Sequence, residues 1–454
     1  MDWKLYRVET SGMKNLSEKI KIDFFPLTVD NKSKKNISKV KAIYGTNGSG
    51  KSAIVNSVYF YKQITRNSSL LKQTSEIVKL NKIINKEKKE FYFSAIYGVK
   101  FNKDEKRDIL KNELTIKFDN NIPFIENEKL SILQDQSING DYSLIYEVIN
   151  GTLNINDKYE AEINKYFKDR TLNLLKYSTC TSIIYEPDVI RDISDYMADY
   201  KTDKKEKLGI IYYLILNMLF VDNVTVFLEK EDMHDEMIDE DIELLLEKIN
   251  NIFSQKKDRE LINYVISSKK DVVVKSQIET YEKNIAGLCD FLKLFKPNLK
   301  NIVIDKREDE QYYYCSKKMV YNGYEVDSDY ESTGIQKLMN IYNSIKDATR
   351  GKIVFIDELD ANINGVYLNC LVEYINNLKT GQLCFTSHNF YPMEYLYKFA
   401  NSIDFIGESV KIVSWKKNGN YKPYNQYPQG MIVDSPFNID AIDFMKVFEQ
   451  EGEK

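Results

Sequence analysis

Apolar and polar positions alternate along the first part of the chain in a way that predicts β-strands interrupted by one helix. Apolar residues recur at helical spacing from residue 52 to about residue 73, directly after a short apolar run that leads into Gly45. Other runs are rich in aromatic and β-branched residues, which are typical of strands. The predicted strands of this part are residues 5–8, 20–24, 40–44, 91–101 and 114–118.

Residues from about 154 to 294 differ in character, because charged segments with helical periodicity dominate and proline is nearly absent. The apolar run 209–221 is too short to span a bilayer and contains Asn217, so it predicts a buried helix. Strand patterns return over 301–327 and 351–356. The sequence thus predicts an α/β domain made from both ends of the chain and interrupted by a helical insertion. We expect its N-terminal part at 1–150, an insertion that forms a short arm or bundle at 151–298, and its C-terminal part at 299–454.

The 454 residues carry 64 lysines and arginines against 68 aspartates and glutamates, a formal net charge of −4. This balance excludes a broadly polycationic nucleic-acid binder, although it leaves room for a local basic groove. Only 2 histidines are present, which leaves almost no room for a multi-histidine metal site. The 5 cysteines are scattered without a C-x-x-C pair, so neither a disulfide framework nor a zinc site is expected. The first residues lack the apolar segment of a signal peptide, and we expect a cytoplasmic protein without a membrane span.

Residues 45–52 (GTNGSGKS) match the pattern G-x-x-x-x-G-K-[ST] of a nucleotide-binding phosphate loop. Glycines here let the backbone curl so that consecutive N–H groups point at a phosphate, with the positive end of the following helix behind them. Lys51 can supply charge to the β- and γ-phosphates of ATP, and the Ser52 hydroxyl can bind Mg²⁺. An apolar strand before the motif and an amphipathic helix after it distinguish this match from a chance glycine-rich turn. The expected nucleotide-binding residues are Asn47, Gly48, Ser49, Gly50, Lys51, Ser52 and Ala53.

The run 353–356 is apolar throughout and is followed by Asp357 and Glu358. Continuous apolar runs are typical of central parallel strands, and ligands bind at the C-terminal ends of such strands. We therefore expect Asp357 to hold Mg²⁺ through water and Glu358 to act as general base on the attacking water. An ordinary strand followed by an acidic turn has the same pattern, and the phosphate loop is what favours the catalytic interpretation.

Two further segments flank this acidic pair. Ser332, Thr333 and Gly334 precede it by about 20 residues, and an apolar run that leads into His388 follows it by about 30 residues. Taken alone, Ser332 is an excellent helix N-cap and His388 is a histidine at a strand end.

Together these motifs resemble the ABC-type ATPase head shared by SMC proteins, their double-strand-break-repair relatives, OLD-family proteins and many bacterial defence ATPases. The resemblance covers about the first 120 and the last 150 residues. It implies that Glu358 and His388 are catalytic, with His388 as the switch histidine, and that Asp360 lies in the D-loop. It also implies that the segment from Ser332 to Gly334, called here the signature-like segment, reaches the γ-phosphate of the opposite subunit. Two ATP molecules would then be sandwiched in a head-to-tail dimer.

The sequence departs from that pattern at two positions, because Thr333 replaces a glycine of the signature and Glu331 replaces its leucine. These departures weaken the case for efficient hydrolysis. Three glutamines are alternatives for the Q-loop position, namely Gln73, Gln134 and Gln136.

Several charged segments are expected to be solvated surface. They are the lysine-rich stretches 32–41, 82–89 and 201–207 and the acidic stretch 229–241, which contains His234. Two sharper alternatives stay open. Converging lysine stretches could bind duplex DNA through its phosphates, and the acidic stretch could dock a basic partner.

We expect an ATPase with slow turnover that acts as a sensor or regulator in bacterial anti-phage defence and controls a separate effector protein. The resemblance points to the ATPase subunits of abortive-infection, PARIS-like or Septu-like systems. The alternatives are a DNA-repair or chromosome-maintenance ATPase of the same architecture and an ATP-dependent scaffold with little turnover. A transporter ATPase is disfavoured by the long insertion and the atypical signature.

Overall fold

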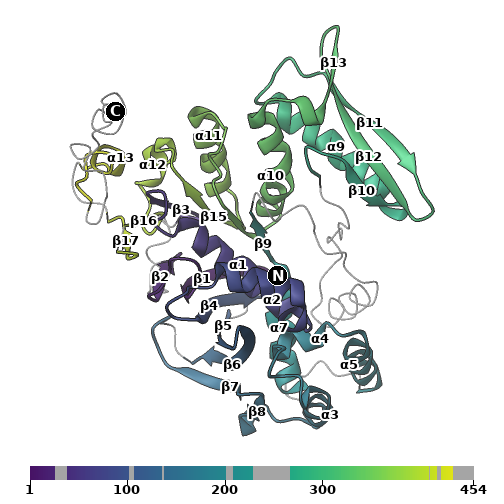
Figure 1. Ribbon diagram of the computed structural model, residues 1–454, viewed down its shortest axis with the longest axis vertical. Helices are drawn as coiled ribbons and strands as arrows, with labels where there is room; N and C mark the ends of the chain where they lie inside the picture. The colour runs from purple at the N-terminus through teal and green to yellow at the C-terminus, as the bar shows by residue number, and fades with distance from the viewer. Residues whose placement is uncertain are drawn as a thin grey trace, which may run out of the picture.

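The computed structural model describes residues 1–25, 38–101, 107–134, 137–200, 208–228, 266–407, 409–416 and 421–432. Figure 1 shows three parts. A central sheet has helices on both of its faces, a second sheet lies below it with a further group of helices, and a smaller lobe projects at the upper right.

The central sheet has the strand order β17-β16-β3-β15-β14-β9. Neighbours pair in parallel from β16 to β9, and β17 runs antiparallel to β16. The middle strands are buried along their whole length, which explains the continuous apolar run at 353–356. Strands from both ends of the chain lie side by side, so the predicted α/β fold around a phosphate loop is confirmed. The bounds are β3 Val40–Gly45, β9 Val224–Phe227, β14 Ile353–Ile356, β15 Gln382–Ser387, β16 Ile403–Ile406 and β17 Ile412–Ser414.

Side chains on the two faces of this sheet belong to two separate hydrophobic clusters. Ile43 and Phe355 pack in one cluster with residues of α1, whereas Ala42 and Val354 pack in the other with residues of α10 and α11. This alternation follows from the two-residue period of a strand. The helices concerned are α1 Lys51–Arg66, α10 Thr333–Thr349, α11 Gly365–Asn376, α12 Tyr391–Leu396 and α13 Pro423–Gln426.

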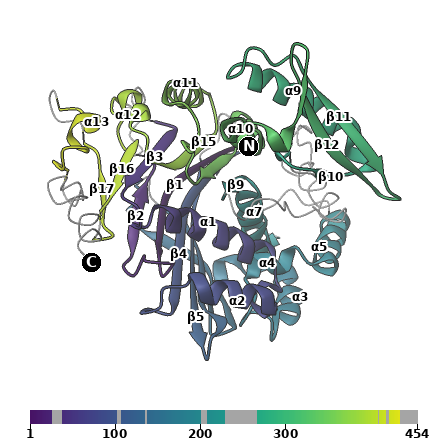
Figure 2. The ribbon, with the colours of Figure 1, turned by 45° about the horizontal axis from the view of Figure 1, so that its top comes forward.

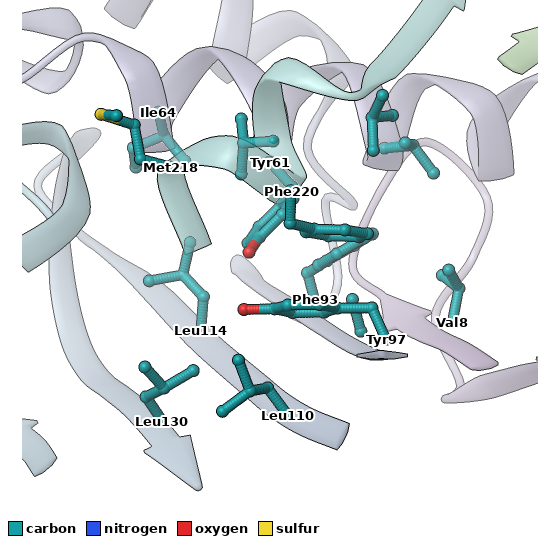
Figure 3. Packing of buried hydrophobic residues seen from close by; sticks show 14 of the residues in the cluster. Val8, Tyr61, Ile64, Phe93, Tyr97, Leu110, Leu114, Leu130, Met218 and Phe220 are labelled. Carbon is teal, nitrogen blue, oxygen red and sulfur yellow. The ribbon is translucent and has the colours of Figure 1, made fainter. Parts of the chain in front are cut away.

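The second sheet is antiparallel, with the order β2-β1-β4-β5-β6-β7-β8. Aromatic rings from α1 and α7 (Ile210–Asp222) pack on its strands (Figure 3). Tyr97 stacks on Phe220 with 3.7 Å between ring centroids, and Tyr61 stacks on Phe93 at 4.3 Å. Because α7 is buried over most of its length, the prediction of a buried helix at 209–221 is confirmed. The bounds are β1 Asp2–Ser11, β2 Ile20–Asp23, β4 Glu90–Lys100, β5 Asp108–Asp119, β6 Ile122–Leu133, β7 Tyr142–Ile149 and β8 Thr152–Ile155.

The range 151–298 is not the helical insertion that the periodicity suggests. β9 lies inside it and is the edge strand of the central sheet, while α4 and α7 contact α1, so this part of the chain completes the head. A strand of four residues is too short for its periodicity to stand out among helices. The remaining helices of this range are α3 Glu162–Thr171, α4 Cys180–Ile184 and α5 Pro187–Tyr200, with a 3₁₀ turn at Asp157–Tyr159. Earlier in the chain, a 3₁₀ turn at Leu70–Lys72 and α2 Thr74–Ile83 follow α1. None of the described helices is long and apolar enough to cross a membrane.

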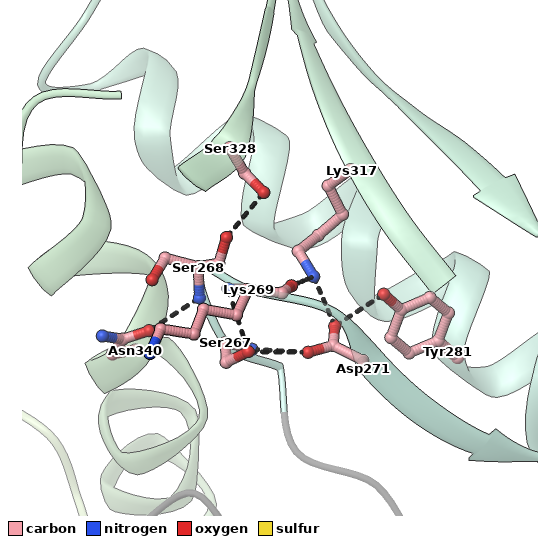
Figure 4. Close-up of polar contacts among 8 residues, drawn as sticks. All are labelled: Ser267, Ser268, Lys269, Asp271, Tyr281, Lys317, Ser328 and Asn340. Atoms are coloured by element: carbon pink, nitrogen blue, oxygen red, sulfur yellow. Dashed lines mark hydrogen bonds and ion pairs between the residues drawn. The ribbon is translucent and has the colours of Figure 1, made fainter. Parts of the chain in front are cut away.

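The smaller lobe is built from α9 and four strands, and therefore is not helical either. Its strand order is β10-β12-β11, with β13 paired to β12, so the expected boundary at residue 298 cuts through the lobe. Lys317 and Asp271 form a buried ion pair of 2.6 Å, and the Tyr281 hydroxyl donates to the same carboxylate at 2.7 Å (Figure 4). These bonds join β12, β10 and α9. The bounds are β10 Asp271–Val274, α9 Ile278–Lys293, β11 Asn301–Glu308, β12 Tyr312–Val320 and β13 Glu325–Asp327, with 3₁₀ turns at Lys275–Gln277 and Ser328–Tyr330.

One buried side chain joins the two large sheets. Gln382, the first residue of β15, accepts a hydrogen bond from the backbone N–H of Leu5 at 2.7 Å and donates one to the Leu5 carbonyl at 3.0 Å. The pairing of β1 with β4 shifts its register between Leu5 and Arg7. The side-chain amide of Gln382 therefore provides hydrogen-bond partners for both the N–H and the carbonyl group of Leu5, as a neighbouring strand would, at the position where the register shifts.

Candidate functional site

Three neighbouring strands bring the predicted motifs to one edge of the central sheet. β3 leads into the phosphate loop, β15 leads into His388, and β14 leads into Asp357. These strands are adjacent and parallel, with Ser387 opposite Tyr44 in the register. Since the C-terminal ends of parallel strands lie at the same edge, segments more than 300 residues apart in the sequence meet there.

The phosphate loop turns tightly between β3 and α1. Gly48 and Gly50 have φ values of 80° and 108°, which L-residues with side chains rarely adopt. A side chain at Gly45 would come within 2.6 Å of the Ile406 carbonyl oxygen, so only glycine fits there. The Ser49 hydroxyl is buried and has no hydrogen-bond partner in the described part of the chain. An unsatisfied hydroxyl inside a loop at a helix N-terminus suits an anionic ligand.

Lys51 is 5% exposed and lies across the loop, where its ammonium donates to the carbonyl oxygens of Gly45 and Thr46, both at 2.8 Å. Burial lowers the pKa of Lys51, and the charges of the acidic residues after β14 act in the opposite direction. The ammonium group of Lys51 therefore interacts electrostatically with the carboxylates that follow β14. The first turn of α1 contains no acidic residue that would oppose an anion.

Asp357 and Glu358 are held by Thr386 on the neighbouring strand. The Thr386 hydroxyl donates to Asp357 Oδ1 at 2.6 Å and accepts from the backbone N–H of Glu358 at 2.8 Å. Glu358 is exposed and has a φ of 50°, a left-handed conformation that is uncommon outside glycine and is concentrated at functional sites. The bond to Thr386 holds this conformation and leaves the Glu358 carboxylate facing solvent.

The Asp360 side chain is held by hydrogen bonds from its own chain. Its Oδ2 accepts hydrogen bonds from the backbone N–H groups of His388 at 3.0 Å and Asn389 at 2.9 Å. This ties the segment after β14 to the segment after β15. The His388 side chain is exposed, and it makes no hydrogen bond to any other residue that the structure describes.

The signature-like segment begins α10. Ser332 and Thr333 are exposed, and no side-chain bond from Ser332 caps the helix. A side chain at Gly334 would lie 2.6 Å from the carbonyl oxygen of Asn362, so this glycine permits close contact with the segment that follows Asp360. The structure thus places the signature-like segment beside the segment that follows Asp360 in the same chain, with Ser332 and Thr333 exposed.

Glu331, which stands in place of the usual leucine, is 8% exposed and fully paired. Its carboxylate accepts from Lys296 at 2.8 Å, from the Tyr321 hydroxyl and from the backbone N–H of Ser332 at 3.2 Å. Burial alone would raise the pKa of Glu331, but the bonds from Lys296 and Tyr321 outweigh it, so the pKa lies below its usual value. Glu331 therefore ties the start of α10 to the smaller lobe.

Ser52 and Asp357, the expected Mg²⁺ ligands, are both partly exposed and are oxygen donors, which suit a hard cation. The bond from Thr386 engages Asp357 Oδ1, so the other carboxylate oxygen is available for a metal-bound water. No group of three or more His, Cys, Asp or Glu side chains in the described residues could hold a metal ion. Such a sparse protein donor set is compatible with Mg²⁺, which usually keeps waters and phosphate oxygens as its other ligands.

Sequence reasoning missed two residues of this site. Thr386 carried no sequence signal of its own, because a hydroxyl near a strand end is common. Asn15, which lies in a turn after β1, donates its side-chain amide to the Gly48 carbonyl and so supports the phosphate loop. Because Asn15 lies far from the motif along the chain, the sequence pattern does not indicate this role.

The Q-loop position stays unassigned. The Gln73 side chain donates to Ser69 at 2.8 Å between the 3₁₀ turn and α2, and Gln134 is exposed after β6. Gln136 lies outside the described residues, as do the acidic stretch with His234 and the lysine stretch 201–207.

Comparisons with known proteins add little to this picture. No family model matches the sequence, and no curated protein matches it either. Among solved structures, two similar chains are of the recombination mediator protein RecF in the RecFOR pathway, described as RecF-ATPrS and RecF-ATP. They are 10% and 13% identical, each covers 91% of this chain and 99% of its own length, and the TM-scores are 0.37 and 0.35. Because these TM-scores are low, the fold assignment depends on the strand order and the phosphate loop described above.

Proposed function

We propose that the chain binds ATP with Mg²⁺ at the edge formed by β3, β15 and β14, and hydrolyses it slowly. The single observation that carries this proposal is that the phosphate loop, the Asp357–Glu358 pair and His388 follow three adjacent parallel strands. A glycine-rich loop alone would indicate phosphate binding. The paired carboxylates that follow β14, which is separated from β3 by β15, add the groups that hydrolysis needs.

Each side chain has a defined task in this proposal. The loop N–H groups and Lys51 hold the β- and γ-phosphates, and Lys51 exchanges its bonds to the Gly45 and Thr46 carbonyls for bonds to phosphate. Ser52, and Asp357 through water, would hold Mg²⁺, which would supply positive charge beside the phosphates. Glu358 accepts the proton of the attacking water, and the exposed His388 contacts the γ-phosphate.

We further propose that two copies assemble head to tail with ATP between them. The exposed Ser332 and Thr333 would then reach the γ-phosphate bound by the partner, with the N-terminus of α10 aimed at the anion. Large apolar side chains around this segment are unusually exposed, with Tyr330 at 82%, Val366 at 58% and Tyr391 at 50%. A second copy that covers them supplies a reason for that exposure.

The biological role that we propose is regulation of a separate effector protein in bacterial anti-phage defence, on the strength of the sequence resemblance. Co-expression with the neighbouring gene product tests this role. Association that depends on ATP supports it, whereas no association with or without ATP contradicts it. The alternative of a repair or chromosome-maintenance ATPase instead predicts ATP-dependent, salt-sensitive binding of duplex DNA without a partner.

Glu358→Gln tests the proposed catalysis. We expect phosphate release to fall by about 10²-fold or more while ATP binding is retained, because the amide cannot take the proton. The matched control is Glu373→Gln, an exposed glutamate on α11, which should leave turnover unchanged. Equal turnover in the Glu358 variant and the wild type would contradict a catalytic role and favour an ATP-dependent scaffold.

A further inference from the structure

A groove of about 360 Å³ lies away from the phosphate loop, between α2, the turn before β4 and the hairpin that joins β5 to β6. Figure 2 shows α2 beside β5 at the lower part of the molecule. The lining of the groove is mainly apolar and also includes lysine and asparagine side chains. Its lining residues are Val78, Asn81, Lys82, Ile84, Lys86, Lys89, Phe118 and Asn121.

Three lysines of one sequence stretch converge on this groove. Lys82, Lys86 and Lys89 are all exposed, and none of them forms an ion pair with a carboxylate in the described part of the chain. The Lys86 ammonium donates to the backbone carbonyl of Asn81. The lysines of the stretch 82–89 are exposed, as the sequence predicts, and three of them line the same groove.

Three lysines just outside the groove are each matched by a glutamate, whereas the exposed Lys14, whose backbone N–H bonds to the Ile83 carbonyl, forms no ion pair in the described residues. The pairs are Lys79 with Glu76 at 2.7 Å, Lys88 with Glu18 at 3.2 Å and Lys117 with Glu126 at 2.5 Å. These glutamates place carboxylates beside the unpaired lysines of the groove. A long polyanion needs a continuous cationic path, so this distribution favours a small anion.

The groove is held in shape by amide side chains. Asn81 donates to the backbone carbonyl of Asn121 at 2.7 Å, which fastens α2 to the β5–β6 hairpin. Asn85 is buried, and its side chain accepts from the N–H groups of Glu87 and Lys88 at 3.1 and 3.0 Å. The lysine-bearing turn is therefore ordered before any ligand binds, which reduces the entropic cost of binding.

We propose that this groove is a second anion site that binds a free, small organic phosphate of the nucleoside monophosphate class. The ammonium groups of Lys82 and Lys89 bind the phosphate. Phe118 and the half-exposed Val78 form an apolar surface for a planar base. The volume lies at the small end of the range for ligand pockets, which suits a mononucleotide better than a larger ligand.

The test measures binding of AMP to the full chain by calorimetry, in a Lys51→Ala background that weakens the phosphate-loop site. AMP also lacks the β-phosphate on which that loop acts. We expect Lys82→Gln with Lys89→Gln to weaken AMP binding by at least about tenfold. The matched control, Lys79→Gln with Lys117→Gln, removes two paired lysines and should leave AMP binding unchanged.

Four outcomes would overturn the proposal. These are no AMP binding, AMP binding that does not depend on Lys82 and Lys89, and AMP binding to the wild type that disappears in Lys51→Ala. The fourth is lysine-dependent binding of single-stranded hexathymidylate without binding of AMP, which would identify a strand as the ligand. Thermal unfolding of each variant verifies the fold, and exposed lysines should change it little.

Discussion

Thr386 donates a hydrogen bond of 2.6 Å to Asp357 Oδ1 and with the same hydroxyl oxygen holds the backbone N–H of Glu358 at 2.8 Å. One buried hydroxyl on β15 thus orients both acidic residues that follow β14. Thr386→Val keeps the shape and removes both bonds. We expect ATP turnover to fall by about 10–100-fold, the usual effect of losing a group that orients a metal-binding carboxylate. Steady-state phosphate release measures it.

Thr386→Ser is the control, because serine keeps the hydroxyl and should restore most of the turnover. Nucleotide binding measured alongside should change far less than turnover in the valine variant. Wild-type turnover in Thr386→Val would show that the Asp357 and Glu358 positions do not depend on this hydroxyl.

The pairing of Glu331 with Lys296 predicts a stability that depends on pH. The pKa of Glu331 lies below its usual value, so the pair contributes stability above the unfolded pKa of glutamate. That stability is lost as the pH falls through the lower, folded pKa. We expect Lys296→Met to reduce the free energy of unfolding at pH 7 by about 1–3 kcal/mol, because it leaves a buried carboxylate short of a partner.

Urea unfolding of Lys296→Met and the wild type at several pH values between 7 and 4 measures this difference. The difference should shrink toward the acid end. Lys293→Met, which removes an exposed i,i+3 pair with Asp290, is the control and should cost much less. A difference that stays constant over this pH range would contradict the role assigned to Glu331.

For the buried Glu128 we expect a contribution to stability that depends on pH in the opposite direction. Burial raises its pKa to about 7, although it accepts bonds from Tyr146 at 2.8 Å and from the N–H of Cys180 at 2.8 Å. Because the pKa of Glu128 is higher in the folded protein than in the unfolded chain, the protonated carboxyl group is the form that the fold favours. Its contribution to stability is complete below the unfolded pKa and is lost as the pH rises through about 7. We expect Glu128→Gln to stabilise the protein by about 1–3 kcal/mol at pH 8, with a smaller gain at pH 5.5.

Thermal unfolding at the two pH values measures the gain from Glu128→Gln. The exposed Glu87→Gln serves as the control and should change little at either pH. If Glu128→Gln destabilises the protein equally at both values, the carboxylate is ionised and well paired, and the interpretation is wrong.

Lys41 and Asp404 form an ion pair of 2.8 Å inside the central sheet, with side chains 2% and 0% exposed. Removing one partner leaves an uncompensated buried charge. We therefore expect Lys41→Met or Asp404→Leu alone to cost about 3–5 kcal/mol. The double variant should recover most of that loss, because two apolar side chains replace two desolvated charges. Urea unfolding of the four proteins in a double-mutant cycle measures the coupling, and additive losses would contradict it.

The sequence predicted the central sheet well, because its buried parallel strands leave continuous apolar runs that alternate with helical periods. The strand patterns over 301–327 are confirmed as well, by β11, β12 and β13 of the smaller lobe. The prediction failed at the short strands β9 and β10, which lie in a range expected to be helical. β9 is four residues long and follows α7 almost directly, so nothing local marks it as the edge of the central sheet. The register that joins β10 to β12 links residues about 40 apart, which periodicity cannot reveal.

The candidate site was predictable where a motif has fixed spacing. Gly45 to Ser52 and Asp357 with Glu358 have such spacing, and the structure brings them to one edge. The supporting residues Thr386 and Asn15 were not predictable, because their roles arise from the pairing of distant segments. The lysine groove required the fold as well, since Phe118 and Asn121 come from a different hairpin than the lysines.

The bond between Gln382 and Leu5 has a mechanical consequence. The same short strand that begins with Gln382 carries Thr386 near its other end and leads into His388. The antiparallel sheet and the hydroxyl group that orients Asp357 and Glu358 are therefore fastened to the same short strand.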